Sequence, residues 1–224
     1  MSAAVFVSGG GTNLQAFIDA VRAGRLDLDL AVVVSNKPDV KALERARCAG
    51  IPAECVQNAD FAERAQFDEA LASTVDRYRP DLLILAGFMR ILTTAFVRRY
   101  EGRILNVHPS LLPRFPGLNT HQRVIDAGDR SHGSTVHFVT AELDGGPAIV
   151  QGRLPVLPGD TALSLSHRVQ ALEHRIYPAA TALFAAGRLT CRNGEAWLDG
   201  QRLDEPLQYC TDAQALGNVT PTCP

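Results

Sequence analysis

Residues 3–14 of the chain read AAVFVSGGGTNL, a short β-rich run joined through three glycines to the start of a helical pattern. The run AAVFVS predicts a buried strand, and the spacing from about Asn13 to Ala23 predicts a helix. Backbone N–H groups at Gly11, Thr12 and Asn13 would then face outward beside a helix N-terminus, where the helix dipole favours an anion. Leu14 stands at the third glycine position of a dinucleotide fingerprint, so the turn predicts a site for a single phosphate. The alternative is a tight turn that binds nothing.

Strands and helices alternate through the rest of the first half. Further strands are expected at 30–35, 53–56, 81–86 and 104–108. The run DLLILA at 81–86 is apolar on both faces, which indicates a central parallel strand. Because parallel strands are joined by right-handed crossovers, the pattern predicts an α/β protein with a doubly wound, Rossmann-like, mostly parallel sheet and flanking helices.

The second half of the sequence has a different pattern. The runs STVHFVT (134–140) and AIVQGRLPV (148–156) flank a turn-rich ELDGGP and predict an antiparallel or mixed extension of the sheet. A long helix is expected from about Thr161 to Ala186, with a kink or a break at Pro178. Residues 187–203 then predict a hairpin with an Asn-Gly turn.

The length of 224 residues allows one large domain or two small ones, and is enough for a sizeable core. We expect a single domain over residues 1–209. It would comprise a phosphate-binding part at about 1–100 and a catalytic part at about 101–209. Residues 210–224 are polar without periodicity and are expected to form a tail.

Composition narrows the class of protein. The formal net charge is −2 and no run of Lys and Arg occurs, which argues against partners such as nucleic acid or an acidic membrane surface. The five cysteines show no CxxC spacing, which argues against a zinc site or a disulfide framework and for a reducing compartment. The N-terminus lacks the pattern of a signal peptide or a membrane span, so we expect a cytoplasmic protein.

Two polar residues, Asn106 and His108, interrupt the apolar run ILNVH at 104–108. Their spacing of two places both side chains on the same face of a strand, at the carboxyl end where α/β sheets bind ligands. An amide that donates hydrogen bonds and an imidazole that carries a proton are suited to stabilise an oxyanion and to move one proton. The alternative is a buried pair satisfied by neighbouring backbone groups.

Each of the other candidate residues also has a purely structural interpretation. AGFMRIL (86–92) carries Phe88, Met89, Ile91 and Leu92, which would form either a wall for a flat aromatic ligand or a satellite core cluster. Asp144 would keep the His108 imidazole protonated if the ELDGGP turn folds toward it, and otherwise is an ordinary turn residue. The proline-rich stretch 108–121 predicts a long functional loop.

Three further polar residues lie on predicted helices. Gln170 and Glu173 are three apart on the long helix and share a face, which predicts either a ligand contact or a solvated stripe. Arg64, on an earlier helix, reads most simply as a surface charge.

Together these blocks resemble the glycinamide ribonucleotide formyltransferases, folate-dependent enzymes of purine synthesis. The blocks that carry the resemblance, in order from residue 1 to about 203, are SGGGTNLQ, NKPDVKALERA, AGFMRIL, ILNVHPSLLPRFPGL, HGSTVHFV, ELDGGP and HRVQALEHRIYP. The NxHPSLLP stretch marks the wider formyltransferase family, whereas SGxGTNLQ and HGSTVHFV point to this member. Two residues depart from some members: Gly10 replaces an Asn, and Asn119 replaces a His.

The resemblance implies a role for each candidate residue. Asn106, His108 and Asp144 match the catalytic residues. The substrate-binding residues would be Gly11, Thr12 and Asn13 for the phosphate, and Gln170 and Glu173 for the ribose. The folate-binding residues would be Arg64, Met89, Arg90, Ile91, Leu92, Asn106, Thr140 and Asp144.

The implied activity is transfer of the formyl group of 10-formyltetrahydrofolate, the cosubstrate, to the amine of N1-(5-phospho-β-D-ribosyl)glycinamide in de novo purine (IMP) biosynthesis. A tetrahedral intermediate would be stabilised by Asn106 and protonated His108. The expected partners are small molecules, with no metal, no nucleic acid and no membrane, in a monomer or weak homodimer.

Two other classes of function remain open at the level of sequence. One is a relative that uses the same three residues, either a formyltetrahydrofolate hydrolase or a methionyl-tRNA formyltransferase. The hydrolase usually carries an extra N-terminal domain and the tRNA enzyme an added basic C-terminal domain, and neither is expected here. The other class is a folate- or nucleotide-binding module without catalytic activity.

Overall fold

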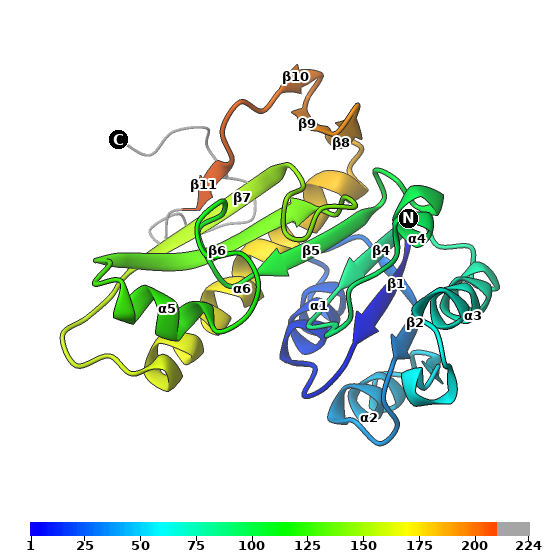
Figure 1. The fold of residues 1–224 in the computed structure, drawn as a ribbon. Coiled ribbons are helices and arrows are strands. Elements are labelled where there is room, and N and C mark those ends of the chain that lie inside the picture. The colour runs from blue at the N-terminus through cyan, green and yellow to red at the C-terminus, as the bar shows by residue number, and fades with distance from the viewer. Residues whose placement is uncertain (210–224) are drawn as a thin grey trace. The chain divides into compact units, whose positions relative to one another are not determined.

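The computed structural model of the chain describes residues 1–209 (Figure 1). The chain forms two compact units, one over Met1–Asn106 and the other from Val107 onward. The division falls close to the predicted boundary between the phosphate-binding and catalytic parts, and the single-domain organisation stays a prediction. The predicted tail at 210–224 lies outside the described residues.

The first unit is built on a parallel sheet. Its strands are β1 (Ser2–Val7), β2 (Asp29–Ser35), β3 (Ala53–Cys55), β4 (Leu82–Leu85) and the first three residues of β5 (Ile104–His108). β4 pairs with β1 on one side and with β5 on the other, whereas β2 pairs with β1 and β3. The strand order therefore reverses between β1 and β4, and ligands of open α/β sheets bind at the carboxyl ends of the strands at such a reversal.

Helices connect these strands, as the alternation predicted. They are α1 (Thr12–Arg22), α2 (Lys41–Cys48), α3 (Arg64–Asp76) and α4 (Thr94–Arg99), together with the short 3₁₀ helix η1 (Asn58–Asp60). Residues Ala3 to Val7 of β1 have no exposed surface, and all of β4 is buried. This burial confirms the interior position predicted for the apolar run 81–86. At α4, the Thr93 hydroxyl accepts a hydrogen bond from the Phe96 N–H at 3.3 Å, which caps the helix as expected from a Thr there.

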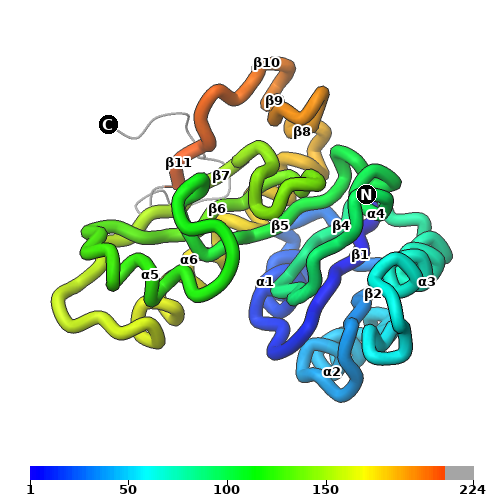
Figure 2. Tube along the Cα trace, in the orientation of Figure 1, coloured from blue at the N-terminus to red at the C-terminus, as the bar shows by residue number. Residues whose placement is uncertain are grey.

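The second unit contains the antiparallel pair predicted for its sequence. β6 (Ser131–Phe138) and β7 (Ala148–Pro155) run side by side, as Figure 2 shows, and β11 (Leu207–Tyr209) pairs parallel to β7. The long helix α6 (Ala162–Ala185) packs on β6 and β7, and the short helix α5 (Thr120–Asp126) packs on α6. The α/β class, with a mostly parallel sheet, an antiparallel pair and flanking helices, is confirmed.

The long helix begins at a capping box. The Ser164 N–H donates to the Thr161 hydroxyl at 3.1 Å, and the Thr161 N–H donates to the Ser164 hydroxyl at 3.0 Å. The helix continues through the buried Pro178, so it is not broken there. After it, β8 (Leu189–Arg192), β9 (Glu195–Leu198) and β10 (Gln201–Arg202) form a small antiparallel sheet. Asn193 and Gly194 between β8 and β9 both have positive φ, which confirms the predicted Asn-Gly hairpin turn.

No helix among residues 1–209 is both long enough and apolar enough to cross a membrane.

The approach of β6 to β7 gives a stability prediction. A Cβ added at Gly133 would lie 1.9 Å from the carbonyl oxygen of Gly152, so the strands would have to separate. We expect Gly133→Ala to lower the free energy of unfolding by about 1–3 kcal/mol, as overpacking does, measured by thermal and denaturant unfolding. Gly9→Ala is the matched control, because nothing lies within 4 Å of a Cβ added there. Equal stability of the two variants would contradict the prediction.

Candidate active site

The carboxyl end of β5 carries Asn106 and His108, with the buried Val107 between them. Their alternation along the strand places the two polar side chains on one face, as predicted. The carbonyl oxygen of His108 accepts two hydrogen bonds of 2.8 Å, one from the Ser110 N–H and one from the Ser134 hydroxyl. The backbone at His108 is therefore held in place just where the strand ends.

Both ring nitrogens of His108 face oxygen atoms that accept hydrogen bonds. Nδ1 lies 3.4 Å from Oδ2 of Asp144, and Nε2 lies 2.9 Å from the carbonyl oxygen of Phe115. The side chains of His108 and Asp144 are only 7% and 8% exposed. A neutral imidazole can donate at one nitrogen only, whereas an imidazolium donates at both. The ring therefore has a hydrogen-bond acceptor beside each of its two nitrogens.

Asp144 reaches His108 because of the glycine-rich turn that carries it. Asp144 has a φ of +52°, and a Cβ added at Gly146 would lie 1.8 Å from the carbonyl oxygen of Phe138. Only glycine permits this close approach of two backbone segments. The Asp144 carboxylate also accepts a 2.8 Å hydrogen bond from the Gly117 N–H, which ties the proline-rich loop to the same turn. The sequence left open whether Asp144 reaches His108, and the structure shows that it does.

A buried polar network anchors the proline-rich loop that follows His108. The Thr135 hydroxyl donates to the Ser110 carbonyl at 2.7 Å and accepts from the Leu112 N–H at 3.1 Å. The Gln151 amide donates to the Leu112 carbonyl at 2.7 Å. Sequence analysis missed Ser134, Thr135 and Gln151, and the available signal was polar residues inside runs that otherwise read as core strands.

Three further histidines of the second unit, His121, His132 and His137, are buried or partly buried. Nδ1 of His121 lies 2.9 Å from Nε2 of His132. Burial, followed by the charge of His121, lowers the pKa of His132 to about 4. Burial also lowers the pKa of His137 to about 4 and lowers the pKa of His121. Burial therefore favours the neutral form of these three rings.

The glycine turn after β1 contains the residues predicted to bind phosphate. Gly11 caps α1 in the left-handed conformation, with φ +69°, and Thr12 is the first residue of the helix. A Cβ at Gly11 would lie 2.7 Å from the Cβ of Ala42 on α2, so a glycine is required there by both conformation and space. Asn13 is buried in the first turn of α1. The N–H groups at this helix start are a suitable site for an anion.

The loop 86–92 after β4 is held by Ser8 at the end of β1. The Ser8 hydroxyl accepts a 2.7 Å hydrogen bond from the Met89 N–H and donates to Asn36 Oδ1 at 2.5 Å. Met89 is 66% exposed and Ile91 is 51% exposed. Phe88 instead packs on Phe6, with ring centroids 5.4 Å apart, so it belongs to the core and not to a ligand wall.

The remaining predicted residues differ in their surroundings. Glu173 is buried on α6, with Oε1 3.2 Å from the Ser134 hydroxyl that also holds the His108 carbonyl, whereas Gln170 is exposed. Arg64 is exposed at the start of α3, and the Arg90 guanidinium lies 5.6 Å from the centre of the Phe67 ring. Thr140 follows the end of β6 and is partly exposed.

Within the second unit the structure therefore brings His108, Asp144, Ser134 and Glu173 together through direct contacts. The residues predicted for phosphate and for most of the folate site lie in the first unit. Residues 1–209 contain no group of three or more His, Cys, Asp or Glu side chains that could hold a metal ion.

The parallel sheet carries a glycine turn at its strand-order reversal, and strand β5 ends in Asn106 and a histidine that lies beside a carboxylate. Residues 1–181 match the formyl transferase family, and the chain belongs to it.

Relatives within this family share most of the chain. Phosphoribosylglycinamide formyltransferase of Escherichia coli is 50% identical over 212 residues, which are 95% of this chain and 100% of that protein. The Haemophilus influenzae protein of the same name is 44% identical over 89% of this chain and 94% of its own length. A solved structure of phosphoribosylglycinamide formyltransferase from Coxiella burnetii superposes with a TM-score of 0.87 at 48% identity, covering 91% of this chain and 95% of that one.

The buried histidines generate a prediction about acid stability. His132 has a folded-state pKa of about 4, below the ordinary value of 6.5, so the unfolded chain binds the proton more readily. The stability that this neutral ring contributes is complete above pH 6.5 and is lost progressively as pH falls toward 4. In His132→Gln, which has no titrating ring, we expect the fall in Tm between pH 7 and pH 5 to shrink by a few degrees. His167→Gln, at an exposed position on α6, is the control and keeps the full dependence. An unchanged pH dependence in His132→Gln would refute this role.

Proposed function

We propose that this protein transfers the formyl group of 10-formyltetrahydrofolate to the primary amine of N1-(5-phospho-β-D-ribosyl)glycinamide in purine biosynthesis. The observation that carries the proposal is the 50% identity to the E. coli phosphoribosylglycinamide formyltransferase over the full length of that relative. The contact of His108 with Asp144 at the end of β5 supports it independently, because formyl transfer passes through an intermediate with negative charge on oxygen.

In the proposed reaction the amine of the acceptor attacks the formyl carbon, and the carbonyl oxygen becomes an oxyanion. The Asn106 amide and the protonated His108 ring donate hydrogen bonds to that oxygen. Asp144 occupies the Nδ1 side of the ring. Nε2–H is therefore the donor available to the intermediate once it no longer donates to the Phe115 carbonyl. The C–N bond to folate N10 then breaks. The attacking amine loses one proton and N10 gains one, so the reaction needs no redox partner.

The proposed substrate contacts follow from the chemistry of each group. The N–H groups at Gly11, Thr12 and Asn13 would bind the phosphate at the start of α1. Gln170 and Glu173 on α6 would bind the ribose hydroxyls, for which a carboxylate is an apt acceptor.

The folate would be held by a separate set of residues. Arg64 would pair with a carboxylate of the folate tail, and the pterin would lie against backbone and apolar groups of the loop after β4. The full proposed set is Arg64, Met89, Arg90, Ile91, Leu92, Asn106, Thr140 and Asp144.

Two variants test the proposed oxyanion site. His108→Ala removes one donor, and Asp144→Asn removes the charge that favours the imidazolium while it keeps an oxygen that can accept from the Gly117 N–H. We expect each to lower kcat on the order of 10²–10³-fold, the usual loss for one oxyanion donor, with both substrates saturating. His167→Ala and Asp27→Asn, both at exposed positions, are the matched controls. Near-wild-type kcat in either test variant would show that the role assignment is wrong.

A folate assay with and without the ribonucleotide acceptor separates the alternatives. Turnover that requires the acceptor supports the proposed transferase. Release of formate without the acceptor would indicate a formyltetrahydrofolate hydrolase that uses the same three residues. Tight folate binding without turnover would indicate a binding module. The assay is run with and without a chelator, which also tests the proposal that no metal takes part.

A further inference from the structure

The three-glycine turn between β1 and α1 is held from behind by helix α2. The Ala42 N–H donates a 3.1 Å hydrogen bond to the Gly9 carbonyl, and Nε of Arg45 donates a 2.9 Å hydrogen bond to the Gly10 carbonyl. Gly11 packs directly against Ala42, so closely that an added Cβ would lie 2.7 Å from the alanine Cβ. Each of the three glycines therefore has its own contact with the first turns of α2.

These contacts decide which way the turn presents its N–H groups. In a trans peptide the C=O of one residue and the N–H of the next point in opposite directions. Both peptide groups of the turn are trans, and both carbonyls point at α2. The N–H groups of Gly10 and Gly11 must therefore face away from α2. The N–H groups at the start of α1 follow directly after them.

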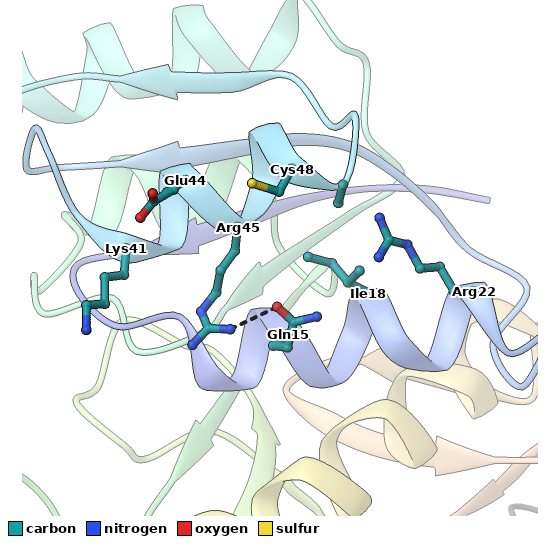
Figure 3. A pocket seen from close by; sticks show the side chains of 8 residues that line it. Gln15, Ile18, Arg22, Lys41, Glu44, Arg45 and Cys48 are labelled. Carbon is teal, nitrogen blue, oxygen red and sulfur yellow. Dashed lines mark hydrogen bonds between the residues drawn. The ribbon is translucent and has the colours of Figure 1, made fainter.

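Arg45 also joins the turn to the helix that follows it. Its Nη1 donates a 2.9 Å hydrogen bond to Oε1 of Gln15, shown by the dashed line in Figure 3. The Gln15 N–H in turn donates to the Gly11 carbonyl at 2.9 Å. One guanidinium thus bridges the middle of the turn and the first turn of α1. Its planar fork makes the two bonds at once, which a lysine ammonium cannot reproduce in the same geometry.

The turn needs these contacts from α2 because its own residues do little to fix its backbone conformation. A Cβ added at Gly9 or Gly10 would meet nothing within 4 Å, so no packing requires glycine at either position. Glycine has the greatest backbone freedom of any residue, and ordering it costs the most entropy. A turn of this kind would present its N–H groups in many directions unless an outside contact selected one.

We propose that Arg45 is a positioning residue for the phosphate of the substrate: it fixes the Gly10 carbonyl and Gln15, and so holds the turn with its N–H groups aimed at the phosphate. This inference rests on the proposed function, which identifies the ribonucleotide substrate as the molecule that carries the phosphate. The guanidinium contacts the side of the turn that faces α2. It therefore affects phosphate binding indirectly, by fixing the direction of the backbone N–H groups.

Steady-state kinetics of Arg45→Lys provide the first test. The substitution keeps the positive charge and removes the fork. We expect KM for the ribonucleotide to rise about tenfold, while kcat and the KM for 10-formyltetrahydrofolate stay within twofold. Arg22→Lys is the matched control, because Arg22 lies in the same groove between α1 and α2 (Figure 3). A wild-type KM in Arg45→Lys would overturn the proposal, as would an equal rise in both KM values.

Binding of inorganic phosphate provides a test that does not depend on turnover. Titration followed by the amide resonances of residues 10–13 is expected to give a Kd about tenfold higher in Arg45→Lys than in the wild type and in Arg22→Lys. If the wild type fails to formylate the ribonucleotide but this difference in Kd is found, the proposed function fails and the role of Arg45 stands. Equal phosphate affinity in all three proteins, or no response at residues 10–13, overturns the role of Arg45.

Discussion

The contact between Nδ1 of His108 and Oδ2 of Asp144 is the interaction on which the rest of the site depends. It requires β5 to end at His108, and the Ser110 N–H and the Ser134 hydroxyl hold that end through the His108 carbonyl. It also requires the glycine turn at 145–146, since any side chain at Gly146 would collide with the Phe138 carbonyl. A buried carboxylate is costly unless hydrogen-bonding partners surround it, and the Asp144 carboxylate lies against the His108 ring and accepts from the Gly117 N–H.

A common physical arrangement recurs at the ends of the strands. Each loop proposed to contact a ligand is held by polar groups of a neighbouring element, which leaves its outer side available. Ser8 holds the Met89 N–H, Arg45 holds the Gly10 carbonyl, and Thr135 holds both Ser110 and Leu112. Backbone groups on irregular segments must find partners when buried, and here those partners also select one conformation of each loop.

Much of the fold could be predicted because its signals are local. Apolar runs at 3–8 and 81–86 and an Asn-Gly turn at 193–194 each depend on residues close in sequence, and all are found in the structure. The short helix α5 was missed because prolines and polar residues around it hide its periodicity. Whether Phe88 belongs to a ligand wall or to the core stayed open, because sequence spacing does not show that β1 presents Phe6 beside it.

The sequence by itself determined the order of the elements, the glycine turn before α1, and the presence of an amide and an imidazole on one face of β5. Only the tertiary structure decided that Asp144 contacts His108 and that the Arg45 guanidinium donates a hydrogen bond to the Gly10 carbonyl. It also decided that Glu173 is buried while Gln170 is exposed. The reason is physical: periodicity and turn chemistry act over a few residues. Burial and hydrogen bonding between side chains far apart in sequence depend instead on how strands and helices pack, which no local pattern encodes.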